Sequence, residues 1–312
     1  MKTQRDLSII IVNFNGARLL EDCLASIAET SASIAHDVWV VDNGSTDNSV
    51  RMVRARFPDV HIIESAENLG FAGGNNLALA SAAGRYRLLL NNDTVVRPHA
   101  LQAMVQAMDA HPELAGIGPR LLNPNGSTQL SCMHYPSLVR GPRNWIKAKL
   151  GQSGKYQPEA EGDIARVDAV VGACLMIRDT ALYQVGLLDP GYFMYAEEMD
   201  WCYSAAKAGW QIGYLPSAEV VHFGGQTAGR EADRFYVERR YSRVRFYMKH
   251  HGRLAARTDD LFIRANIVLR WLTHPGERKR YAALLGAYNR RVAMLFAAAG
   301  KRMQYDPQKV AG

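Results

Sequence analysis

A regular alternation of strand-like and helix-like segments over the first hundred residues is the feature that most constrains the fold. Four short apolar runs are typical of buried strands, and the segments between them carry apolar residues at helical spacing. The strand-like runs lie at 7–13, 37–42, 60–64 and 86–91, and the helical segments lie at 16–29, 45–57, with Ser45 as a candidate N-cap, and 72–84. Strict alternation predicts an α/β fold with a mainly parallel, doubly wound sheet. Ligands of such sheets bind at the carboxyl ends of the strands.

The alternation becomes irregular after residue 98. Helices are predicted at 99–110 and from 179, a strand at 167–178, and two short strands at 211–216 and 218–223. Prolines and Gly-Ser pairs mark residues 123–165 as a long loop region. Loops of this kind usually carry substrate-specific contacts, so we expect this region to help select a substrate.

Charge divides the chain into two regions. Residues 230–312 carry 19 Lys and Arg against 7 Asp and Glu, a net charge of +12, whereas residues 1–229 carry 18 against 23, a net charge of −5. We therefore expect two regions with different roles, a domain at 1–229 and a basic helical region at 230–312. A basic surface can contact nucleic acid, an anionic membrane or an acidic substrate. The region has no recognised nucleic-acid-binding motif, so nucleic acid is not expected as a partner.

Cysteine usage and hydropathy indicate a cytoplasmic protein. The four cysteines are scattered, with neither a CxxC pair typical of zinc sites nor a disulfide framework, and this favours a reducing compartment. No apolar run approaches the ~20 residues that span a bilayer. The basic region is therefore either a solvated helical face packed on the preceding domain or a peripheral contact with the inner face of the cell membrane.

Polar residues follow each of the early strands. They are Asn13 and Asn15, then Asp42, Asn43 and Ser45, then Asn68, and finally Asn91, Asn92 and Asp93. At a single site such residues are explained by turn formation. Four successive strand ends of this kind predict a hydrogen-bonding rim at the ligand-binding edge of the sheet.

Two segments of this rim suggest binding of phosphate and metal. The run "NLGFAGGNN", with Gly70, Gly73 and Asn75, is a glycine-rich turn into a helix, where backbone N–H groups can meet phosphate. Close packing of helix and strand explains the same glycines. In "LLLNNDTVV", Asp93 emerges from a buried strand as a candidate ligand for a divalent cation. The alternative is a turn that caps the next helix.

Three carboxylates, Glu197, Glu198 and Asp200, crowd into four positions of the aromatic run "FMYAEEMDWCYSAAKAGW". Like charges held close together oppose ionisation, so a cation, a proton or a substrate is expected among them. The alternative is a first-turn acidic set that complements the dipole of a helix at 198–208.

Taken together, these motifs resemble the family 2 glycosyltransferases of GT-A fold. The resemblance rests on "IIIVNFNG", "VVDNGSTDNS", "NLGFAGGNN", "LLLNNDT", "GACLMIRDTAL", "VGLLDPGYFMYAEEMDWCYSAAKAGW" and "AEVVHFGG", in this order over residues 7 to 250. The chain is most similar to the rhamnosyltransferase-like branch of bacterial surface polysaccharide synthesis. The resemblance implies inverting transfer of a sugar, with dTDP-L-rhamnose or a UDP-sugar as donor. The implied acceptor is a saccharide or a lipid-linked saccharide, and the implied cofactor is Mg²⁺ or Mn²⁺.

The resemblance also implies roles on the donor side. The metal motif Asp-x-Asp of the family falls on Asn91-Asn92-Asp93, so Asn replaces the first Asp and Asp93 is the main carboxylate ligand. His222 matches a histidine that helps to hold metal or diphosphate. Asp42 matches the residue that contacts the base, and the region around Asn13 lines the nucleoside pocket. With the rim and the glycine-rich turn, the expected donor-binding residues are Asn13, Asn15, Asp42, Asn43, Asn68, Gly70, Gly73, Asn75, Asn91 and Asn92.

On the acceptor side, the family's Glu-Asp pair falls on Glu197-Glu198, so Glu replaces the usual Asp. We assign Glu198 as the catalytic base, because single displacement needs a group that takes the proton of the acceptor hydroxyl. Glu197 and Asp200 would bind the acceptor or orient the base. Tyr195 and Trp201 would wall the acceptor pocket. Two other classes stay open at this point: a sugar nucleotidyltransferase, which would release pyrophosphate, and a non-catalytic saccharide- or nucleotide-binding module.

Overall fold

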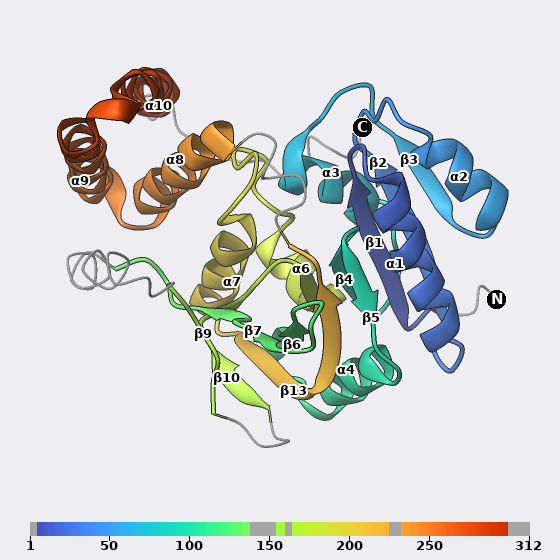
Figure 1. The fold of residues 1–312 in the computed structure, drawn as a ribbon. Helices are drawn as coiled ribbons and strands as arrows, with labels where there is room; N and C mark the ends of the chain where they lie inside the picture. The colour runs from blue at the N-terminus through green and yellow to red at the C-terminus, as the bar shows by residue number, and fades with distance from the viewer. Residues whose placement is uncertain (1–4, 138–153, 160–163, 225–231, 299–312) are drawn as a thin grey trace.

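The computed structural model describes residues 5–137, 154–159, 164–224 and 232–298 (Figure 1). The N-terminal part alternates strands and helices in the predicted order. Its elements are β1 (Leu7–Asn13), α1 (Ala17–Thr30), β2 (His36–Asp42), α2 (Ser49–Arg56), β3 (His61–Glu64), α3 (Gly70–Leu79) and β4 (Tyr86–Asn91). These four strands are parallel and lie in the order β3-β2-β1-β4. The doubly wound α/β prediction is thereby confirmed.

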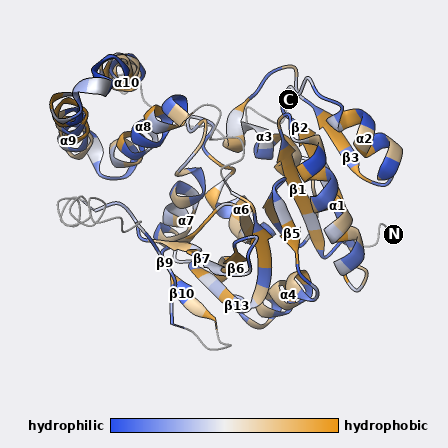
Figure 2. Cartoon of the chain, viewed as in Figure 1, coloured by the Kyte–Doolittle hydropathy of each residue, from blue (hydrophilic) through white to orange (hydrophobic). Residues whose placement is uncertain are grey.

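Strand β1 occupies the centre of this parallel part of the sheet. Ile9, Ile10 and Ile11 are consecutive and all three are completely buried. Because successive side chains of a strand point to opposite faces, both faces of the sheet are covered here. Figure 2 shows that the central strands are hydrophobic along most of their length.

The second half of the sheet is mixed. It is built from β5 (Thr94–Val96), α4 (Ala100–Ala110), β6 (Leu114–Leu122), β7 (Thr128–Gln129), β10 (Ala165–Val167), β12 (Cys174–Arg178), α6 (Asp179–Val185), α7 (Glu197–Lys207) and β13 (Gln211–His222). Strand β12 runs antiparallel between β4 and β6, while β13 runs parallel to β6. The full order of the sheet is β10-β13-β6-β12-β4-β1-β2-β3.

Two strand predictions in this half are wrong. The two short strands expected at 211–216 and 218–223 are one strand, β13, because an irregularity in its pairing with β6 between Leu215 and Glu219 absorbs Pro216. The single strand expected at 167–178 is interrupted at 171–173. Its first part, β11 (Ala169–Val170), joins β8 (Cys132–Met133) and β9 (Lys155–Tyr156) in a small antiparallel sheet.

The C-terminal helices α8 (Ala232–His250), α9 (Gly252–Thr273) and α10 (Arg278–Ala298) are joined by the short helix η1 (Pro275–Glu277). They pack around a hydrophobic core of their own, which includes Val244, Ile263 and Tyr288. The basic helical region that the sequence predicts is therefore present, although the proposed boundary at 229/230 lies outside the described residues. In the described part of the chain, no helix combines the length and the hydropathy needed to cross a bilayer.

Candidate active site

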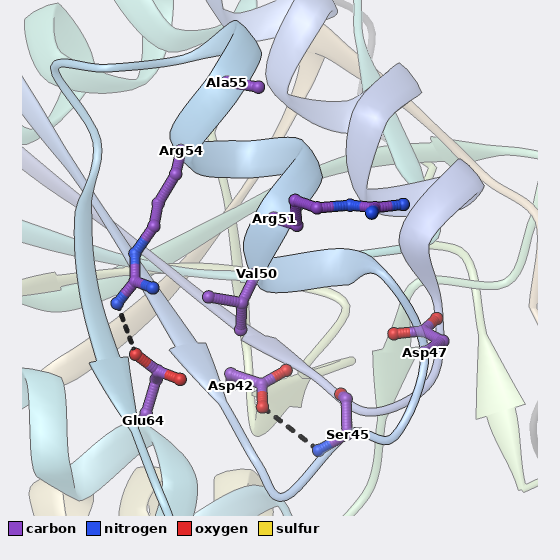
Figure 3. Close-up of a pocket in the computed structure, with 8 residues that line it drawn as sticks. All are labelled: Asp42, Ser45, Asp47, Val50, Arg51, Arg54, Ala55 and Glu64. Atoms are coloured by element: carbon purple, nitrogen blue, oxygen red, sulfur yellow. Dashed lines mark hydrogen bonds and ion pairs between the residues drawn. The ribbon is translucent and has the colours of Figure 1, made fainter.

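Asp42 ends strand β2 and lines a surface pocket of ≈ 620 Å³ beside α2 (Figure 3). Its carboxylate is buried, and Oδ2 accepts the backbone N–H of Ser45 at 3.0 Å. In the described structure, Oδ1 is buried without a hydrogen-bond partner. A buried acceptor without a partner is costly, so a ligand that donates a hydrogen bond to Oδ1 would be stabilised here.

Asn15 organises the loop between β1 and α1. Its backbone is left-handed, with φ of +50°, and its Oδ1 accepts the N–H groups of Thr46 at 2.8 Å and Asp47 at 3.3 Å. The N–H of Asn15 donates in turn to Ser45 Oγ at 2.9 Å. Asn15 therefore shapes the rim by joining the ends of β1 and β2. The predicted N-cap role of Ser45 is wrong, because α2 begins only at Ser49.

The turn that starts α3 is held by the buried side chain of Asn43. Its Nδ2 donates to Asn68 Oδ1 at 3.1 Å and to the carbonyl of Gly70 at 3.0 Å, while its Oδ1 accepts the N–H of Leu69. Asn68 Oδ1 also accepts the N–H of Gly70 at 2.9 Å. Asn43 and Asn68 thus fix the position of Gly70 and of the helix N-terminus.

The other predicted residues of this turn pack closely. A side chain at Gly73 would meet Leu69 Cβ at 2.8 Å, so packing alone explains this glycine. Asn75 Nδ2 donates to the carbonyl of Phe71 at 2.9 Å, but its Oδ1 is buried without a partner in the described structure. Asn75 therefore leaves an acceptor available close to the helix N-terminus.

The residues after β4 form a polar cluster with the end of β13. His222 Nε2 lies 3.4 Å from Asp93 Oδ1 and 3.3 Å from Asn91 Nδ2. Asn92 turns the other way and donates to Asn13 Oδ1 at 2.7 Å, so Asn92 and Asn13 brace each other across β4 and β1. The structure thus brings His222 together with Asn91 and Asp93, which precede it by more than a hundred residues in the chain.

Gln129 fixes the orientation of the His222 ring. Its Oε1 lies 2.6 Å from His222 Nδ1. Its Nε2 donates to two oxygens, Oδ1 of Asn123 and the backbone carbonyl oxygen of His222. The amide orientation therefore requires that His222 Nδ1 carries a proton. In a neutral ring, Nε2 then presents its lone pair toward Asp93, and a cation between these two acceptors would satisfy both.

The carboxylates Glu197 and Glu198 are both buried at the start of α7. The two residues that precede α7, Tyr195 and Ala196, have a left-handed backbone, with φ of +71° each. Conformations of this kind are strained for residues other than glycine and are typical of functional sites. The fold therefore sustains strain in order to place these carboxylates.

Burial dominates the electrostatics of the pair. It raises the pKa of Glu197 well above its usual value, and the neighbouring charge of Glu198 raises it further. Burial also raises the pKa of Glu198, but backbone N–H groups, including that of Gly172, and the positive charge of Lys155 oppose this shift. Each carboxyl has one buried oxygen, Oε2, that has no partner in the described structure. Glu198 is therefore the member of the pair that is better stabilised as an anion.

One turn joins the Glu198 side of the site to the Asp93 side. The N–H of Gly172 donates to Glu198 Oε1 at 3.3 Å, and the carbonyl of the next residue, Ala173, accepts the N–H of Asn91 at 2.9 Å. A second link joins the loop before α7 to α3, because the N–H of Phe71 donates to the carbonyl of Phe193 at 2.8 Å. The carboxylates and the polar rim are therefore linked through the backbone.

Comparison with known proteins identifies the family. The model described as glycosyl transferase family 2 matches residues 8–154, and the model described as glycosyl transferase family group 2 matches residues 88–274. An N-acetylglucosaminyl-diphospho-decaprenol L-rhamnosyltransferase of Mycobacterium tuberculosis is 32% identical over 248 residues, which cover 72% of this chain and 78% of that protein.

The chain belongs to glycosyltransferase family 2. A low-salt glycan biosynthesis hexosyltransferase of Haloferax volcanii is 28% identical over 70% of this glycosyltransferase and 67% of that protein. Because the members of this family are glycosyltransferases, neither the nucleotidyltransferase nor the non-catalytic module is retained.

Solved structures confirm the GT-A fold of this glycosyltransferase. A mannosyltransferase of Pyrobaculum calidifontis in complex with GDP-Man and Mn²⁺ has a TM-score of 0.55 at 18% identity, over 99% of this chain and 84% of that one. GalNAc-T7 with UDP, GalNAc and Mn²⁺ has a TM-score of 0.57 at 14% identity, over 79% of this chain and 48% of that one.

Two residues expected at the acceptor pocket of this glycosyltransferase are buried elsewhere. Trp201 is 1% exposed, and its indole N–H donates to the carbonyl of Gly186 at 2.9 Å, so it packs in the core of the described structure. Asp200 is buried and accepts hydrogen bonds from Lys249 and Tyr192, and it lies 2.7 Å from the ring nitrogen of His250. Asp200 is therefore part of an ion-pair cluster with α8.

Sequence reasoning missed several residues that support this site. Gln129 lies in the segment 123–165, which the sequence marks only as a loop region. Asn76 binds both the carbonyl (2.8 Å) and the N–H (3.1 Å) of Leu188 and so ties α3 to the loop before α7. Lys249 pairs with both Asp189 (3.2 Å) and Asp200 (2.6 Å). The only sequence signal for the ion pairs of Lys249 is the run of cations in "RRYSRVRFYMKHHG".

Proposed function

We propose that this glycosyltransferase is an inverting enzyme that moves a sugar from a pyrimidine nucleotide-sugar to a hydroxyl of a saccharide or lipid-linked saccharide. The favoured donor is dTDP-L-rhamnose, and a UDP-sugar is the alternative. The relative from M. tuberculosis is named for rhamnosyl transfer to a lipid-linked diphosphosaccharide, which supports this choice. Its setting would be polysaccharide synthesis for the cell envelope, at the cytoplasmic face of the membrane.

The observation that carries the proposal is the turn at Gly172 and Ala173. It holds Glu198 and Asn91 through adjacent residues, so a base and a binding site for the leaving group are supported by one piece of backbone. Single displacement requires both groups in one site, on either side of the reacting carbon.

The hydrogen bonding of Asp42 favours a pyrimidine as the base of the nucleotide-sugar. Because Oδ2 is taken by Ser45, only Oδ1 is available to a ligand. Uracil and thymine present a single imide N–H, which matches one free oxygen. Guanine presents two neighbouring donors, N1–H and N2–H, which are best matched by both oxygens of a carboxylate.

Asp93 and His222, with the amide of Asn91, would hold the divalent cation. The fit rests on the two acceptors that face each other at 3.4 Å and on the ring orientation set by Gln129. Carboxylate oxygen and imidazole nitrogen suit Mn²⁺, and one carboxylate also suits Mg²⁺. When bound, the metal would neutralise the charge that develops on the leaving diphosphate.

In the proposed reaction, the acceptor hydroxyl oxygen forms a bond with the anomeric carbon while the bond from that carbon to the diphosphate oxygen breaks. The hydroxyl proton passes to Glu198 Oε2, which has no other partner in the described structure. Burial raises the pKa of Glu197, which favours its protonated form, and in that form its carboxyl would donate a hydrogen bond to the acceptor. Tyr195 would contact the acceptor sugar, with the guanidinium of Arg239 4.7 Å above its other side.

The test combines binding with turnover. Melting temperatures are measured with UDP, dTDP and GDP, each with and without Mn²⁺, because a ligand of the folded state raises them by mass action. We expect UDP or dTDP to stabilise the protein more than GDP, and Asp93→Asn to remove the effect of Mn²⁺. No response to any nucleotide would contradict the proposal.

Turnover tests the base. Glu198→Gln should lower the rate of nucleoside diphosphate release in the presence of acceptor about 10²- to 10⁴-fold, the usual contribution of a positioned base. Glu29→Gln, an exposed carboxylate on α1, is the matched control and should leave the rate unchanged. Unchanged turnover in Glu198→Gln would refute the assignment of the base.

A further inference from the structure

Helix α9 carries most of the large apolar side chains that the described part of the molecule exposes. Seven of eleven lie on it, including Leu254 (80% exposed), Leu261 (66%) and Leu272 (54%). The others on this helix are Phe262, Val268, Leu269 and Trp271. Figure 2 shows hydrophobic and hydrophilic residues side by side around α9.

The exposed residues form a continuous stripe. Leu254, Leu261, Val268 and Leu272 follow one another at intervals of seven, seven and four residues, which places them on one side of a helix. The opposite side, with Ile263 and Ile267, is buried in the C-terminal core. The helix is therefore apolar on two sides, and the described residues cover only one of them.

The acidic residues of α9 face away from this stripe. Asp259 is buried and accepts from Arg243 Nε at 2.9 Å. Asp260 is buried and accepts from Arg264 Nε and Tyr288, both at 2.9 Å. The exposed side chains of α9 are therefore apolar, cationic or neutral, and none of them is a carboxylate.

Arginines border the stripe. Arg253 and Arg257 are exposed and lie over the ring of Phe296, each with its guanidinium carbon 5.9 Å from the ring centre. Arg278 lies 5.0 Å above the ring of Trp271. None of these three arginines forms an ion pair with a carboxylate of the described residues.

This charge pattern decides between two occupants of the stripe. A second copy of the chain would bring the same arginines together, and the exposed side of α9 offers no carboxylate to pair with them. An anionic lipid surface supplies both a negative charge for the arginines and an apolar environment for the leucines. Its phosphates pair with arginine, and its acyl chains contact the leucine side chains.

We propose that α9 lies in the plane of an anionic membrane surface, with Leu254, Leu261, Val268 and Leu272 inserted below the phosphate level. Arg253 and Arg257 would bind the phosphates. This inference rests on the proposed function only in that a lipid-linked acceptor would be reached at such a surface. The excess of positive charge in residues 230–312 does not indicate which helix contacts the membrane, whereas the apolar stripe assigns the contact to one face of α9.

The test is sedimentation of the full-length protein with vesicles of phosphatidylcholine alone or with about 30% phosphatidylglycerol. We expect binding that requires the anionic lipid and decreases with salt. The double variant Leu261→Ser, Leu272→Ser should lower the partition coefficient at least about tenfold, since both side chains lose their apolar contact. Tyr183→Ser on α6, which removes the most exposed aromatic side chain (94% exposed), is the matched control and should bind like the wild type.

Two results would overturn the inference. One is equal vesicle binding by the wild type and the double variant, or none by either. The other is a concentration-dependent dimer, seen by light scattering without lipid, that the double variant loses; this would assign the stripe to a second copy. Both variants should keep the same nucleotide-dependent melting shifts, so a failure of this inference is distinguishable from a failure of the proposed function.

Discussion

Replacing Gly70 by alanine would test whether α3 and the loop before α7 depend on each other. Gly70 has a left-handed backbone, with φ of +73°, and a Cβ atom built on it would lie 2.1 Å from the carbonyl oxygen of Phe193. That oxygen accepts the N–H of Phe71 at 2.8 Å. The side chain can therefore be accommodated only if the Phe193 carbonyl moves and this hydrogen bond breaks.

The expected loss of stability has three parts. A left-handed backbone costs alanine about 1–2 kcal/mol. Loss of a partner by a buried N–H costs about 1–3 kcal/mol. Displacement of packed backbone adds about 1 kcal/mol. Gly70→Ala should therefore lower the free energy of unfolding by about 4 kcal/mol.

Gly126→Ala is the matched control, because Gly126 also has a left-handed backbone, with φ of +82°, but has nothing within 4 Å of the added Cβ atom. It should cost only about 1–2 kcal/mol. Urea unfolding measures both values, and turnover should fall in Gly70→Ala alone because the loop carries Tyr195 to the site. Equal losses in the two variants, or full activity of Gly70→Ala, would refute the reasoning.

Three further predictions concern buried ionisable groups. Lys249→Met removes a cation 2.6 Å from the buried carboxylate of Asp200, so it should lower the free energy of unfolding by about 2 kcal/mol in urea melts; an unchanged midpoint would mean that His250 alone compensates the charge. Burial raises the pKa of Glu197 above its value of 4.5 in the unfolded chain, so the folded state binds the extra proton and loses stability as the pH rises from 4.5 toward the folded pKa. Glu197→Gln should therefore be more stable than the wild type at about pH 8 but not at about pH 4, and denaturation curves with equal pH dependence would contradict this. Burial raises the pKa of the Cys23 thiol to about 12, so iodoacetamide should label it at about pH 8 only after unfolding, as mass spectrometry of the native protein can check.

Local signals in the sequence were sufficient for the N-terminal half of the fold. The apolar run of β1 and the helical spacing after it involve neighbouring residues only, so they identify the strand, the helix and their order. The sheet edge that gathers Asn13, Asp42 and Asn91 follows from that order, because the carboxyl ends of parallel strands meet.

The remaining features depend on contacts between distant residues. No local pattern indicates that Gln129 orients His222, or that Trp201 packs under Gly186 and not beside the acceptor. The continuity of β13 was missed because Pro216 lacks the N–H that an interior strand residue donates. The irregularity between Leu215 and Glu219 leaves Pro216 out of the pairing with β6 and lets the strand continue.

The ion pairs that join α8 to α7 and to the loop before α7 have a consequence for synthesis of the chain. Asp200 is separated from Lys249 by 49 residues, and Asp189 is separated from it by 60. While the ribosome produces the protein from its N-terminus, the parallel sheet can form before these cations emerge. Burying either carboxylate at that stage would leave a charge uncompensated. The helix that carries Glu197 and Glu198 should therefore reach its final position last, and a nascent chain that ends at β13 should hold a folded parallel sheet in which these carboxylates are not yet fixed in place.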